Sequence, residues 1–371
     1  MSVNNPDLAT IPWADTARQE LFNSWLSSCI QEFSLDPSTL ELASADASFR
    51  RYFRLLGSDA AKTSFIIMDA PPDKENCDSF VSIAALFHKA GLLVPQILSW
   101  NRIDGFLLLS DLGTFTLLQQ LGTELDLSSS HVTPPLKPFI KALDALVLLQ
   151  QASTPDVLPL YDEALLYKEL CLFPDWYLSK HKGISLTTEQ QNVLDSSFKT
   201  IIQSNLSAPS VFVHRDFMTR NLMVPTNLDE ERLGVLDFQD AVMGPITYDI
   251  ASLMRDAFCS WSEEFVLDVT IRYWERIRTT GLIDANGWSE DFGEFWRAVE
   301  WMGLQRHLKV AGIFARLTIR DNKTKYLADA PRFLNYIRST GQRYRELFPL
   351  IRMLDKIENT QSNQAFSFGR L

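Results

Sequence analysis

Several common signals are missing from this 371-residue chain. Its four cysteines, Cys29, Cys77, Cys171 and Cys259, stand apart in the sequence, and none is spaced as a metal-binding pair. All have apolar neighbours, so we expect reduced, mostly buried thiols. The first residues lack a cationic segment followed by an apolar run, and no apolar stretch reaches the roughly 18 residues of a membrane span. These absences predict a cytoplasmic protein with no membrane partner.

Positive charge is also in short supply. The chain has 35 Lys and Arg against 46 Asp and Glu, which is a formal net charge of −11. A nucleic acid or an anionic membrane requires a basic surface, so we expect neither as a partner. The argument does not extend to a bound nucleotide, whose phosphates can be neutralised by a metal ion and a few local cations. Hydrophobic content of 46% is typical of a globular protein with ample core, which we expect to be a monomer.

The order of apolar patterns predicts a small first lobe in a chain long enough for two. The patterns are a helix at 14–34, apolar or alternating runs at 47–56, 63–70 and 105–113, and an amphipathic helix at 79–92. Strand, strand, helix and strand with short connections are typical of a small α+β lobe. We assign residues 1–112 to this lobe.

The rest of the chain is predominantly helical. A polar connector at 122–137 contains a serine run and two prolines, and helical patterns follow from residue 138. Strands return only near 211–224 and 233–238. We assign 113–355 to a large helical lobe and 356–371 to a polar tail that we expect to be poorly ordered. The sequence therefore predicts an α+β fold with a strand-rich first lobe and a mainly helical second lobe.

A polar turn lies between two short apolar runs in VFVHRDFMTRNLMV, residues 211–224. The turn carries Asp216 and Asn221, and the next apolar run ends at Asp237. If the segments form a hairpin, these side chains supply a carboxylate base and oxygen ligands within one small site. Mg²⁺ is bound by few carboxylate or amide oxygens, with phosphates and waters completing its shell. A carboxylate near an acceptor hydroxyl can take its proton during transfer.

Each of these residues, taken alone, also has a purely structural explanation. Asp216 and Asn221 are common turn formers, and a strand-ending Asp237 often caps the next element. Asp249, in the helical segment TYDIASLMRDAF, fits a first-turn charge favoured by the helix dipole. The ordered set is different. H-x-D-x-x-x-x-N, followed about sixteen residues later by a strand ending in Asp, is typical of a kinase-like phosphotransferase.

On these residues the chain resembles the aminoglycoside phosphotransferase family, the small-molecule branch of the protein-kinase-like fold. The resemblance extends over most of the chain. More narrowly, ADASFRRYFR, LFPDWY, VHRDFMTRNLMV and GLQRHLKVAGIFAR are similar to segments of bacterial anomeric sugar kinases, which act on N-acetylmuramate and N-acetylglucosamine in cell-wall (peptidoglycan) recycling. The catalytic motif is shared by the whole superfamily and indicates only phosphotransfer. The LFPDWY and GLQRHLKVAGIFAR segments indicate the narrower group.

The resemblance implies ATP and Mg²⁺ as cofactors and a role for most of the motif. Asp216 would be the catalytic base, and Asn221 and Asp237 would be the Mg²⁺ ligands. His214 would hold the catalytic loop, and Asp249 would accept backbone N–H groups of that loop and fix its shape. Arg215 receives no role.

The resemblance also indicates where adenine would bind. FLLLSDLG, residues 106–113, is similar to the strand and hinge that follow the first lobe of kinases. Backbone groups at Ser110, Asp111 and Leu112 would hydrogen-bond the base. Taken as bare sequence, the same run is equally an ordinary strand and turn.

The first lobe lacks two features of protein kinases. It has no G-x-G-x-x-G loop, and FIIMDA offers Met68 and Asp69 where the third strand of a kinase carries lysine. A triphosphate needs positive charge facing its oxygens. We expect Arg51, and after it Arg54, to provide that charge. The alternative is that these arginines line the solvated face of an edge strand.

Two segments of the second lobe are candidates for the sugar pocket. LFPDWY places Asp175 and Trp176 after a proline, and aromatic rings commonly pack on sugars, although such clusters are often core. GLQRHLKVAGIFAR interrupts an apolar helix with Gln305, Arg306, His307 and Lys309, which cannot all share one solvated face. Some of these groups must approach the interior or a cleft. We take Arg306 and His307 as sugar candidates, Arg306 because it suits the lactyl carboxylate of N-acetylmuramate. A salt bridge or a surface position would explain either residue equally.

Two other functions remain open at this point. The chain could phosphorylate another small molecule, such as a different sugar, an amino alcohol or an aminoglycoside. It could also be a nucleotide-binding pseudokinase that regulates a partner. The ordered Asp216, Asn221 and Asp237 disfavour a pseudokinase, whereas the missing strand lysine is compatible with one.

Overall fold

The computed structural model describes residues 13, 15–45, 49–127, 129, 132–227 and 229–358. The chain divides into two compact units, each built from two segments. Unit 1 comprises residues 1–117 and 220–240, and unit 2 comprises 118–219 and 241–371. The boundary predicted at 112/113 lies close to the first crossing, but 220–240 returns to unit 1. Most of the predicted polar tail lies outside the described residues.

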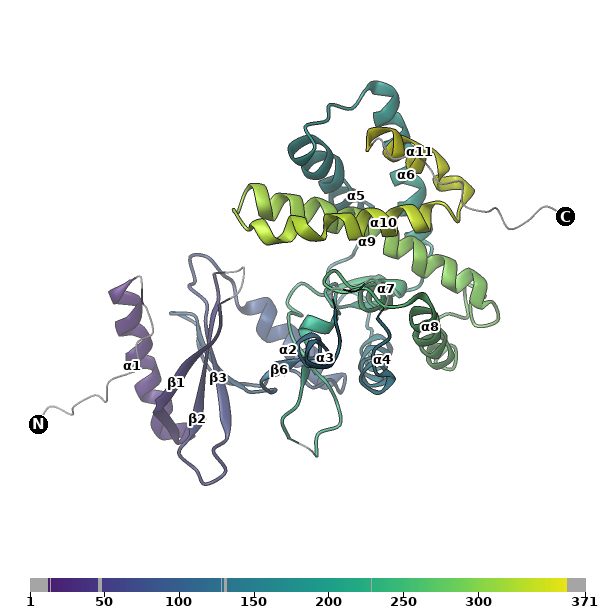
Figure 1. The fold of residues 1–371 in the computed structure, drawn as a ribbon. Coiled ribbons are helices and arrows are strands. Elements are labelled where there is room, and N and C mark those ends of the chain that lie inside the picture. Colours follow the sequence, from purple (N-terminus) through teal and green to yellow (C-terminus); the bar gives the residue numbers. More distant parts are fainter. Residues whose placement is uncertain are drawn as a thin grey trace, which may run out of the picture. The chain divides into compact units, whose positions relative to one another are not determined.

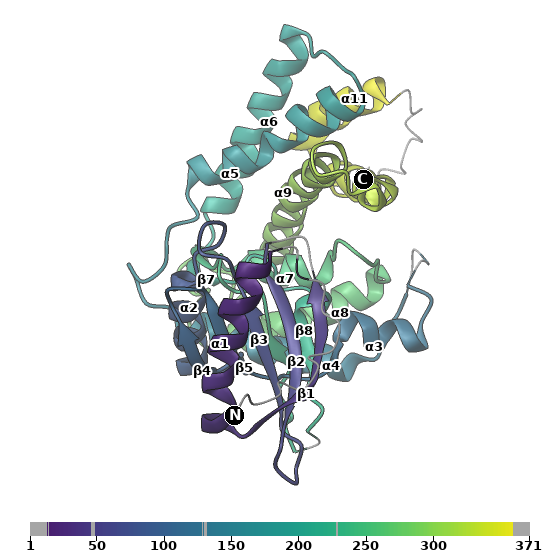
Figure 2. The ribbon, with the colours of Figure 1, turned by 90° about the vertical axis from the view of Figure 1, so that its left-hand side faces the viewer.

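Unit 1 is built around a five-stranded antiparallel sheet in the order β1-β2-β3-β5-β4. Its strands are β1 (Leu35–Ala45), β2 (Arg51–Gly57), β3 (Ser64–Asp69), β4 (Ile97–Asn101) and β5 (Phe106–Ser110). Helix α1 (Thr16–Phe33) covers one face of this sheet (Figure 2). Phe22 and Trp25 of α1 pack there against Phe53 of β2 and Phe106 of β5. These aromatic contacts form the core of the unit.

Two strands of this sheet were not predicted. β1 reads LDPSTLELASA and β4 reads ILSWN, and both are edge strands of the sheet. An edge strand tolerates proline and polar residues, so its apolar pattern is weak. The alternative explanation for Arg51 and Arg54 placed them on an edge strand. That placement is wrong, because their strand β2 pairs with both β1 and β3.

A second, three-stranded sheet in unit 1 has the order β6-β8-β9. It consists of β6 (Phe115–Thr116), β8 (Leu222–Val224) and β9 (Gly234–Val235). The pairing of β8 with β9 confirms the predicted hairpin after Asn221. Helix α2 (Asp78–Lys89) lies beside it, because Phe80 and Phe87 of α2 pack on Phe238, which follows β9.

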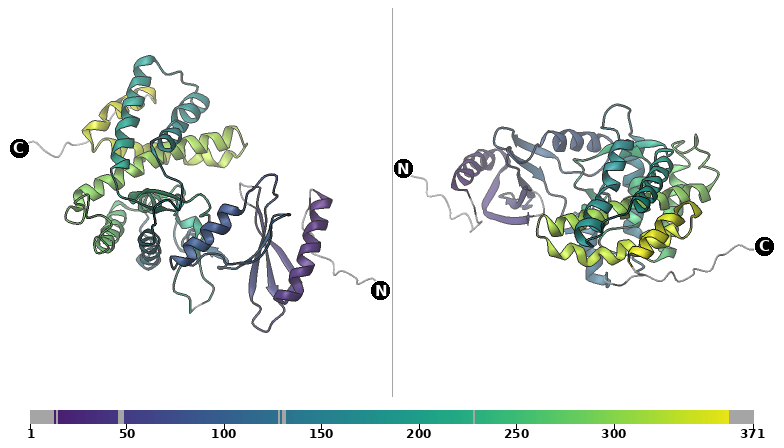
Figure 3. Two further views of the ribbon diagram at one scale, coloured as in Figure 1. Left: turned by 180° about the vertical axis from the view of Figure 1, so that it is seen from behind. Right: turned by 90° about the horizontal axis from the view of Figure 1, so that it is seen from above.

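Unit 2 is mainly helical, with one two-stranded sheet of β7 (Ser210–Val213) and β10 (Val242–Pro245) (Figures 1 and 3). Short helices α3 (Leu117–Glu124) and η2 (Thr219–Asn221) cross the unit boundaries, and α3 occupies the start of the predicted connector. The other elements are α4 (Leu136–Gln151), α5 (Glu163–Leu170), η1 (Phe173–His181), α6 (Thr188–Leu206), α7 (Thr247–Met254), α8 (Glu263–Ile277), α9 (Phe292–Ile319), η3 (Thr324–Asp329), α10 (Ala330–Gly341), η4 (Arg345–Leu347) and α11 (Phe348–Ile357). No helix within the described ranges is long and apolar enough to span a membrane.

Helix α9 organises unit 2. It is 28 residues long and packs against η1, and also against α10 and α7, which are labelled near it in Figure 1. A Cβ added at Gly312 would lie 2.3 Å from the backbone carbonyl carbon and oxygen of Leu172, just before η1. Only glycine permits this close approach. The polar residues Gln305, Arg306 and His307 of α9 are buried, which confirms that polar groups of this helix enter the interior.

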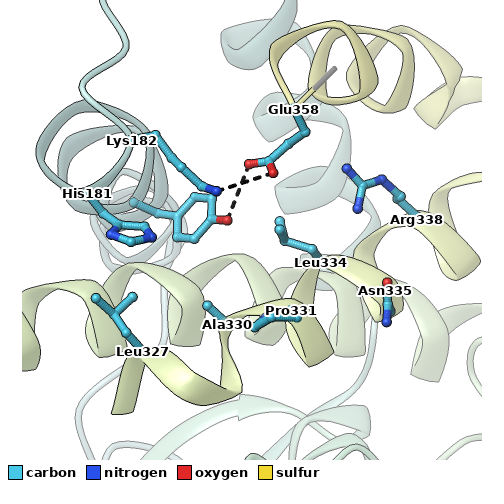
Figure 4. Close-up of a pocket in the computed structure, with 10 residues that line it drawn as sticks. His181, Lys182, Leu327, Ala330, Pro331, Leu334, Asn335, Arg338 and Glu358 are labelled. Atoms are coloured by element: carbon cyan, nitrogen blue, oxygen red, sulfur yellow. Dashed lines mark hydrogen bonds and ion pairs between the residues drawn. The ribbon is translucent and has the colours of Figure 1, made fainter. Parts of the chain in front are cut away.

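A cavity of about 300 Å³ opens in unit 2 (Figure 4). It is lined by residues of η1, of η3 and α10, and of the chain after α11: Tyr177, His181, Lys182, Leu327, Ala330, Pro331, Leu334, Asn335, Arg338 and Glu358. The Tyr177 hydroxyl and the Lys182 ammonium both contact the Glu358 carboxylate, at 3.3 and 3.4 Å. None of the predicted sugar-binding residues lines it.

Candidate functional site

The loop that follows β7 carries the proposed base. Two backbone N–H groups at its start, those of His214 and Arg215, donate to the two oxygens of Asp249 at 2.7 and 3.0 Å. Asp249 lies in the first turn of α7 and is fully buried. Burial raises the pKa of Asp249 to about 6, although His214 and Arg306 act in the opposite direction. Asp249 therefore accepts two backbone N–H groups of the loop, and its role in fixing the shape of a catalytic loop stays a prediction.

Arg215 has an unusual backbone conformation within this loop. Its φ is +76°, in the left-handed region that residues other than glycine rarely adopt. Its carbonyl oxygen accepts a 2.8 Å hydrogen bond from Nη1 of Arg306, and its own Nη2 donates to Oε1 of Glu169 at 2.6 Å. The backbone N–H of the next residue, Asp216, donates to Nδ1 of His214 at 3.2 Å. The Asp216 side chain is half-buried.

Glu169 is the centre of a buried charge cluster in unit 2. Besides Arg215, its carboxylate contacts Lys309 at 2.8 Å, Gln305 at 3.2 Å and the hydroxyl of Tyr161. Burial alone would raise the pKa of Glu169, but Lys309 and Arg215 lower it to about 2. Glu169 is therefore an ionised anchor for two cations.

Sequence reasoning missed Glu169 and a second carboxylate, Asp256. Asp256 accepts hydrogen bonds from the backbone N–H and the hydroxyl of Thr219, at 3.1 and 2.6 Å, and is fully buried. A signal existed for Glu169, since it shares the buried face of α5 with Leu166 and Leu170. A charged residue within an apolar helical stripe indicates a buried partner. No comparable pattern marks Asp256.

The proposed metal ligands lie close together in unit 1. Nδ2 of Asn221 is 3.3 Å from Oδ2 of Asp237, and the Leu236 N–H donates to the Asn221 carbonyl at 2.9 Å. Asp237 is exposed, has a φ of +64° and accepts a 2.9 Å hydrogen bond from Gln239. One amide oxygen and one carboxylate are hard donors that fit Mg²⁺, which takes few protein ligands.

Arg51 of β2 lies on the face of the five-stranded sheet that α1 covers. Its guanidinium contacts Asp69 at 2.5 Å and sits 4.0 Å from the centre of the Trp13 ring. Arg18 of α1 contacts the same carboxylate at 2.6 Å. Asp69 of β3 is fully buried. It joins α1 to the sheet through Arg18 and also pairs with Arg51 of the neighbouring strand β2.

Arg54 and Asp111, which were both predicted to bind the nucleotide, form an ion pair with each other. Arg54 donates to the Asp111 carboxylate at 2.6 Å and to the Gly113 carbonyl at 2.8 Å, which ties β2 to the chain after β5. Ser64 also donates to Asp111, at 2.6 Å. The Ser110 N–H donates to the Gln96 carbonyl at 3.0 Å. The charge of Arg54 is thus matched by that of Asp111.

Sequence reasoning also passed over Arg50, a third arginine of this segment. Its guanidinium pairs with Glu75 at 3.1 Å, and the residue as a whole is only 8% exposed. Arg50 and Arg51 are adjacent in the sequence, yet Arg51 pairs with Asp69 beside α1 and Arg50 pairs with Glu75.

The sugar candidates differ in exposure. Asp175 is exposed and Trp176 is half-buried in the first turn of η1. Arg306 and His307 are buried at 3% and 2% exposure. The ring of His307 stacks on that of Tyr336, with centroids 4.5 Å apart. Burial, and after it the positive charges of Arg255 and Arg306, lower the pKa of His307 well below its usual value. Their role in sugar binding stays a prediction.

Known proteins resemble the chain at two levels. A family profile described as "Phosphotransferase enzyme family" (APH) matches residues 39–285. A protein of Neisseria meningitidis serogroup B named N-acetylmuramate/N-acetylglucosamine kinase is 45% identical over 95% of this chain and 99% of its own length. A protein of the same name from Pseudomonas aeruginosa is 45% identical over 92% of this chain and 97% of its own length.

Solved structures share the fold at low sequence identity. A Plasmodium vivax ethanolamine kinase has a TM-score of 0.58 at 12% identity and covers 93% of each chain. The ADP-bound aminoglycoside phosphotransferase APH(2'')-Ib has a TM-score of 0.52 at 14% identity over 84% of this chain and 97% of its own. These likenesses confirm the predicted α+β, kinase-like fold. Together with the profile match and the 45% identical relatives, they show that this chain is an enzyme of the APH phosphotransferase family.

Proposed function

We propose that this chain transfers the γ-phosphate of ATP to the anomeric (C1) hydroxyl of N-acetylmuramate and N-acetylglucosamine, as a cytoplasmic step in the recycling of cell-wall sugars. The observation that carries the proposal is the shared name of three relatives, 42–45% identical over 92–95% of this chain. These matches cover nearly the whole chain, so they extend well beyond the catalytic motif.

Asp216 is the proposed base. As the C1 oxygen bonds to the γ-phosphorus and the bond to the β–γ bridging oxygen breaks, the hydroxyl proton passes to the Asp216 carboxylate and ADP leaves. The hydrogen bonds that hold the backbone of His214 and Arg215, just before Asp216, support this role. A base must lie within hydrogen-bond reach of the acceptor, so its direction must be fixed.

Asn221 and Asp237 are the proposed Mg²⁺ ligands. These two side chains would hold the ion, and the bound ion would supply positive charge that offsets the charge of the phosphates during transfer. Asn221 follows Asp216 by five residues, so a fully extended chain would separate their Cα atoms by no more than about 18 Å. Asp237 contributes the charged oxygen, and Gln239 and Asn221 hold that carboxylate.

The residues proposed to bind ATP are those that the resemblance to kinases indicates. Backbone groups at Ser110, Asp111 and Leu112 would bind adenine. Arg51 and Arg54 would face the phosphates, although both already neutralise a carboxylate of unit 1. Asp175, Trp176 and His307 are the proposed sugar contacts. Arg306, which the sequence also predicted as a sugar contact, donates instead to the Arg215 carbonyl.

The decisive assay uses purified full-length protein with Mg²⁺, ATP or GTP, and a panel of amino sugars, following diphosphate release. We expect release with N-acetylmuramate and N-acetylglucosamine, and ³¹P NMR should show phosphate coupled to the C1 proton. The methyl glycoside of N-acetylglucosamine is the matched control, because its C1 oxygen is blocked. Phosphorylation of that glycoside, or phosphate on another carbon, would refute the C1 assignment and leave phosphotransfer standing.

A second panel tests the alternative acceptors. Structures that share the fold include an ethanolamine kinase and aminoglycoside phosphotransferases, at 12–14% identity. Ethanolamine and an aminoglycoside should therefore be assayed beside the sugars. We expect both to be at least about 1,000-fold poorer in kcat/KM, because a polar site rejects ligands that leave its groups unpaired.

A further inference from the structure

Arg215 combines two features that rarely occur together. It is the residue immediately before the proposed base, and its backbone is left-handed although it is not glycine. A side chain at φ +76° crowds its own carbonyl, so the conformation persists only where the surroundings impose it. Such strain concentrates at functional sites. The motif itself explains neither the arginine nor its conformation.

Three helices of unit 2 hydrogen-bond to Arg215. Asp249 of α7 accepts the Arg215 N–H at 3.0 Å, Arg306 of α9 donates to the Arg215 carbonyl at 2.8 Å, and Glu169 of α5 accepts from the guanidinium at 2.6 Å. The three partners lie 34, 91 and 46 residues away in sequence. Both backbone polar groups and the side chain of one residue are thus held from separate elements.

The partners are themselves fixed. The Arg306 guanidinium is buried and lies 4.7 Å from the centre of the Tyr248 ring, so it has little freedom to follow a moving loop. Glu169 is held by Lys309 and Gln305, and Lys309 also donates to the Tyr248 hydroxyl at 3.1 Å. A rigid donor and a rigid acceptor define one position for the atoms that they bind.

We propose that Arg306 and Glu169 are positioning residues that hold Arg215 in its left-handed conformation and thereby fix the direction of Asp216. The proposal rests on the proposed function only in taking Asp216 as the base. Without these contacts, Arg215 would return to a negative φ, a rotation of about 140°. That rotation redirects the next residue, so the base would leave its working position in most molecules.

The proposal differs from a sugar-binding role for Arg306. A residue that binds the sugar changes KM for the sugar, and no change at Arg215 can replace it. A residue that maintains a strained backbone changes kcat, and glycine at the strained position can replace it, because glycine adopts a positive φ without a clash.

The first test is a double-mutant cycle on activity. Arg306→Met should lower kcat about 30-fold with KM for the sugar and for ATP within about threefold of wild type. Arg215→Gly in the Arg306→Met background should recover at least about fivefold of that loss. The matched double variant Arg306→Met/Arg215→Ala should recover nothing, because alanine keeps the clash.

Arg306→Lys keeps one donor and serves as the milder variant should Arg306→Met fold poorly. Glu169→Gln tests the third anchor, and we expect it to lower kcat about tenfold with the same pattern of KM values. A tenfold or greater rise in KM for the sugar without glycine rescue would overturn the proposal and assign Arg306 to sugar binding.

The second test needs no substrate, so it separates failure of this proposal from failure of the proposed function. Thermal midpoints are measured for Arg215→Gly and Arg215→Ala, each alone and with Arg306→Met. Alanine is ordinarily at least as stable as glycine, but at a left-handed residue we expect the glycine variant to have the higher midpoint by about 2 °C or more. An equal or lower midpoint for the glycine variant in both backgrounds would overturn the proposal even if the enzyme phosphorylates its sugars.

Discussion

Two loops carry the proposed catalytic carboxylates, and they are held in different ways. The loop of Asp216 follows β7 in unit 2, and that of Asp237 follows β9 in unit 1. Each contains a left-handed residue other than glycine, Arg215 in one and Asp237 itself in the other. The first is fastened by buried charged side chains of three helices. The second is exposed and bonds to Asn221 and Gln239, which are sixteen and two residues away.

The difference follows from the work proposed for each carboxylate. A general base acts at one point on one hydroxyl, so its direction must be set by the protein beforehand. A Mg²⁺ ligand binds an ion that itself orders its ligands and phosphates, so a local turn suffices. A substitution in the Asp237 loop should therefore lower activity far more than stability. Loss of a contact that holds the Asp216 loop should lower the stability of the fold.

Apart from replacement of the proposed base itself, the largest effect is expected for Asp237→Asn. Loss of the charged ligand should lower kcat about 100- to 1,000-fold, because a bound metal supplies several kcal/mol of charge stabilisation. The free energy of unfolding should change by less than about 1 kcal/mol, because the side chain is exposed. Urea denaturation and Mg²⁺ titration of kcat measure the two quantities. Gln239→Ala is the control, with a few-fold effect. A large loss of stability in Asp237→Asn would break the comparison.

Asp249→Ala, in contrast, should chiefly lower the stability of the protein. It leaves the N–H groups of His214 and Arg215 without their acceptor, and a buried unsatisfied donor costs about 1–3 kcal/mol. We expect the free energy of unfolding to fall by about 2–5 kcal/mol, measured by urea denaturation. Asp249→Asn retains one acceptor oxygen and should lose less. Equal stability of the alanine variant and wild type would contradict the proposed fastening.

Gly312→Ala tests the packing that brings η1 against α9. The added Cβ would meet Leu172 backbone atoms at 2.3 Å, so the helices must separate, at a cost of about 1–3 kcal/mol. Gly303→Ala on the same helix is the matched control, since its Cβ would find only the Arg255 side chain at 3.6 Å. That control should be neutral or up to about 1 kcal/mol more stable. Thermal denaturation of the pair measures the difference, and similar midpoints would refute the close contact.

The smallest effect concerns the pH dependence of stability. Because the folded pKa of Glu169 is about 2 against an ordinary 4.5, its stabilisation is present above pH 4.5 and is lost as pH falls towards 2. Glu169→Gln should therefore be about 1–3 kcal/mol less stable than wild type at pH 7, with a smaller gap at pH 3. Glu163→Gln, an exposed position on the same helix, should show no such gap. A gap in Glu169→Gln that is constant from pH 7 to 3 would contradict the ion pairing.

The limits of sequence reasoning follow the same division. Asp216, Asn221, Asp237 and Asp249 could be named in advance, because a motif fixes them by spacing along one stretch of chain. The roles of Glu169 and Arg306 could not, because their partner Arg215 lies 46 and 91 residues away and only the folded chain brings them together. The edge strands β1 and β4 escaped prediction for a related reason. A strand with one neighbour buries less of its surface, so its sequence carries less apolar pattern.

The central claim is that Asp216 is the base for phosphorylation of a sugar hydroxyl. Its most direct test is a single-turnover measurement with N-acetylglucosamine and ATP, comparing wild type with Asp216→Asn, together with ATP affinity measured by calorimetry. The account predicts a rate lower by about 100- to 10,000-fold with an ATP Kd within about threefold of wild type. A variant that transfers phosphate at the full wild-type rate would contradict it.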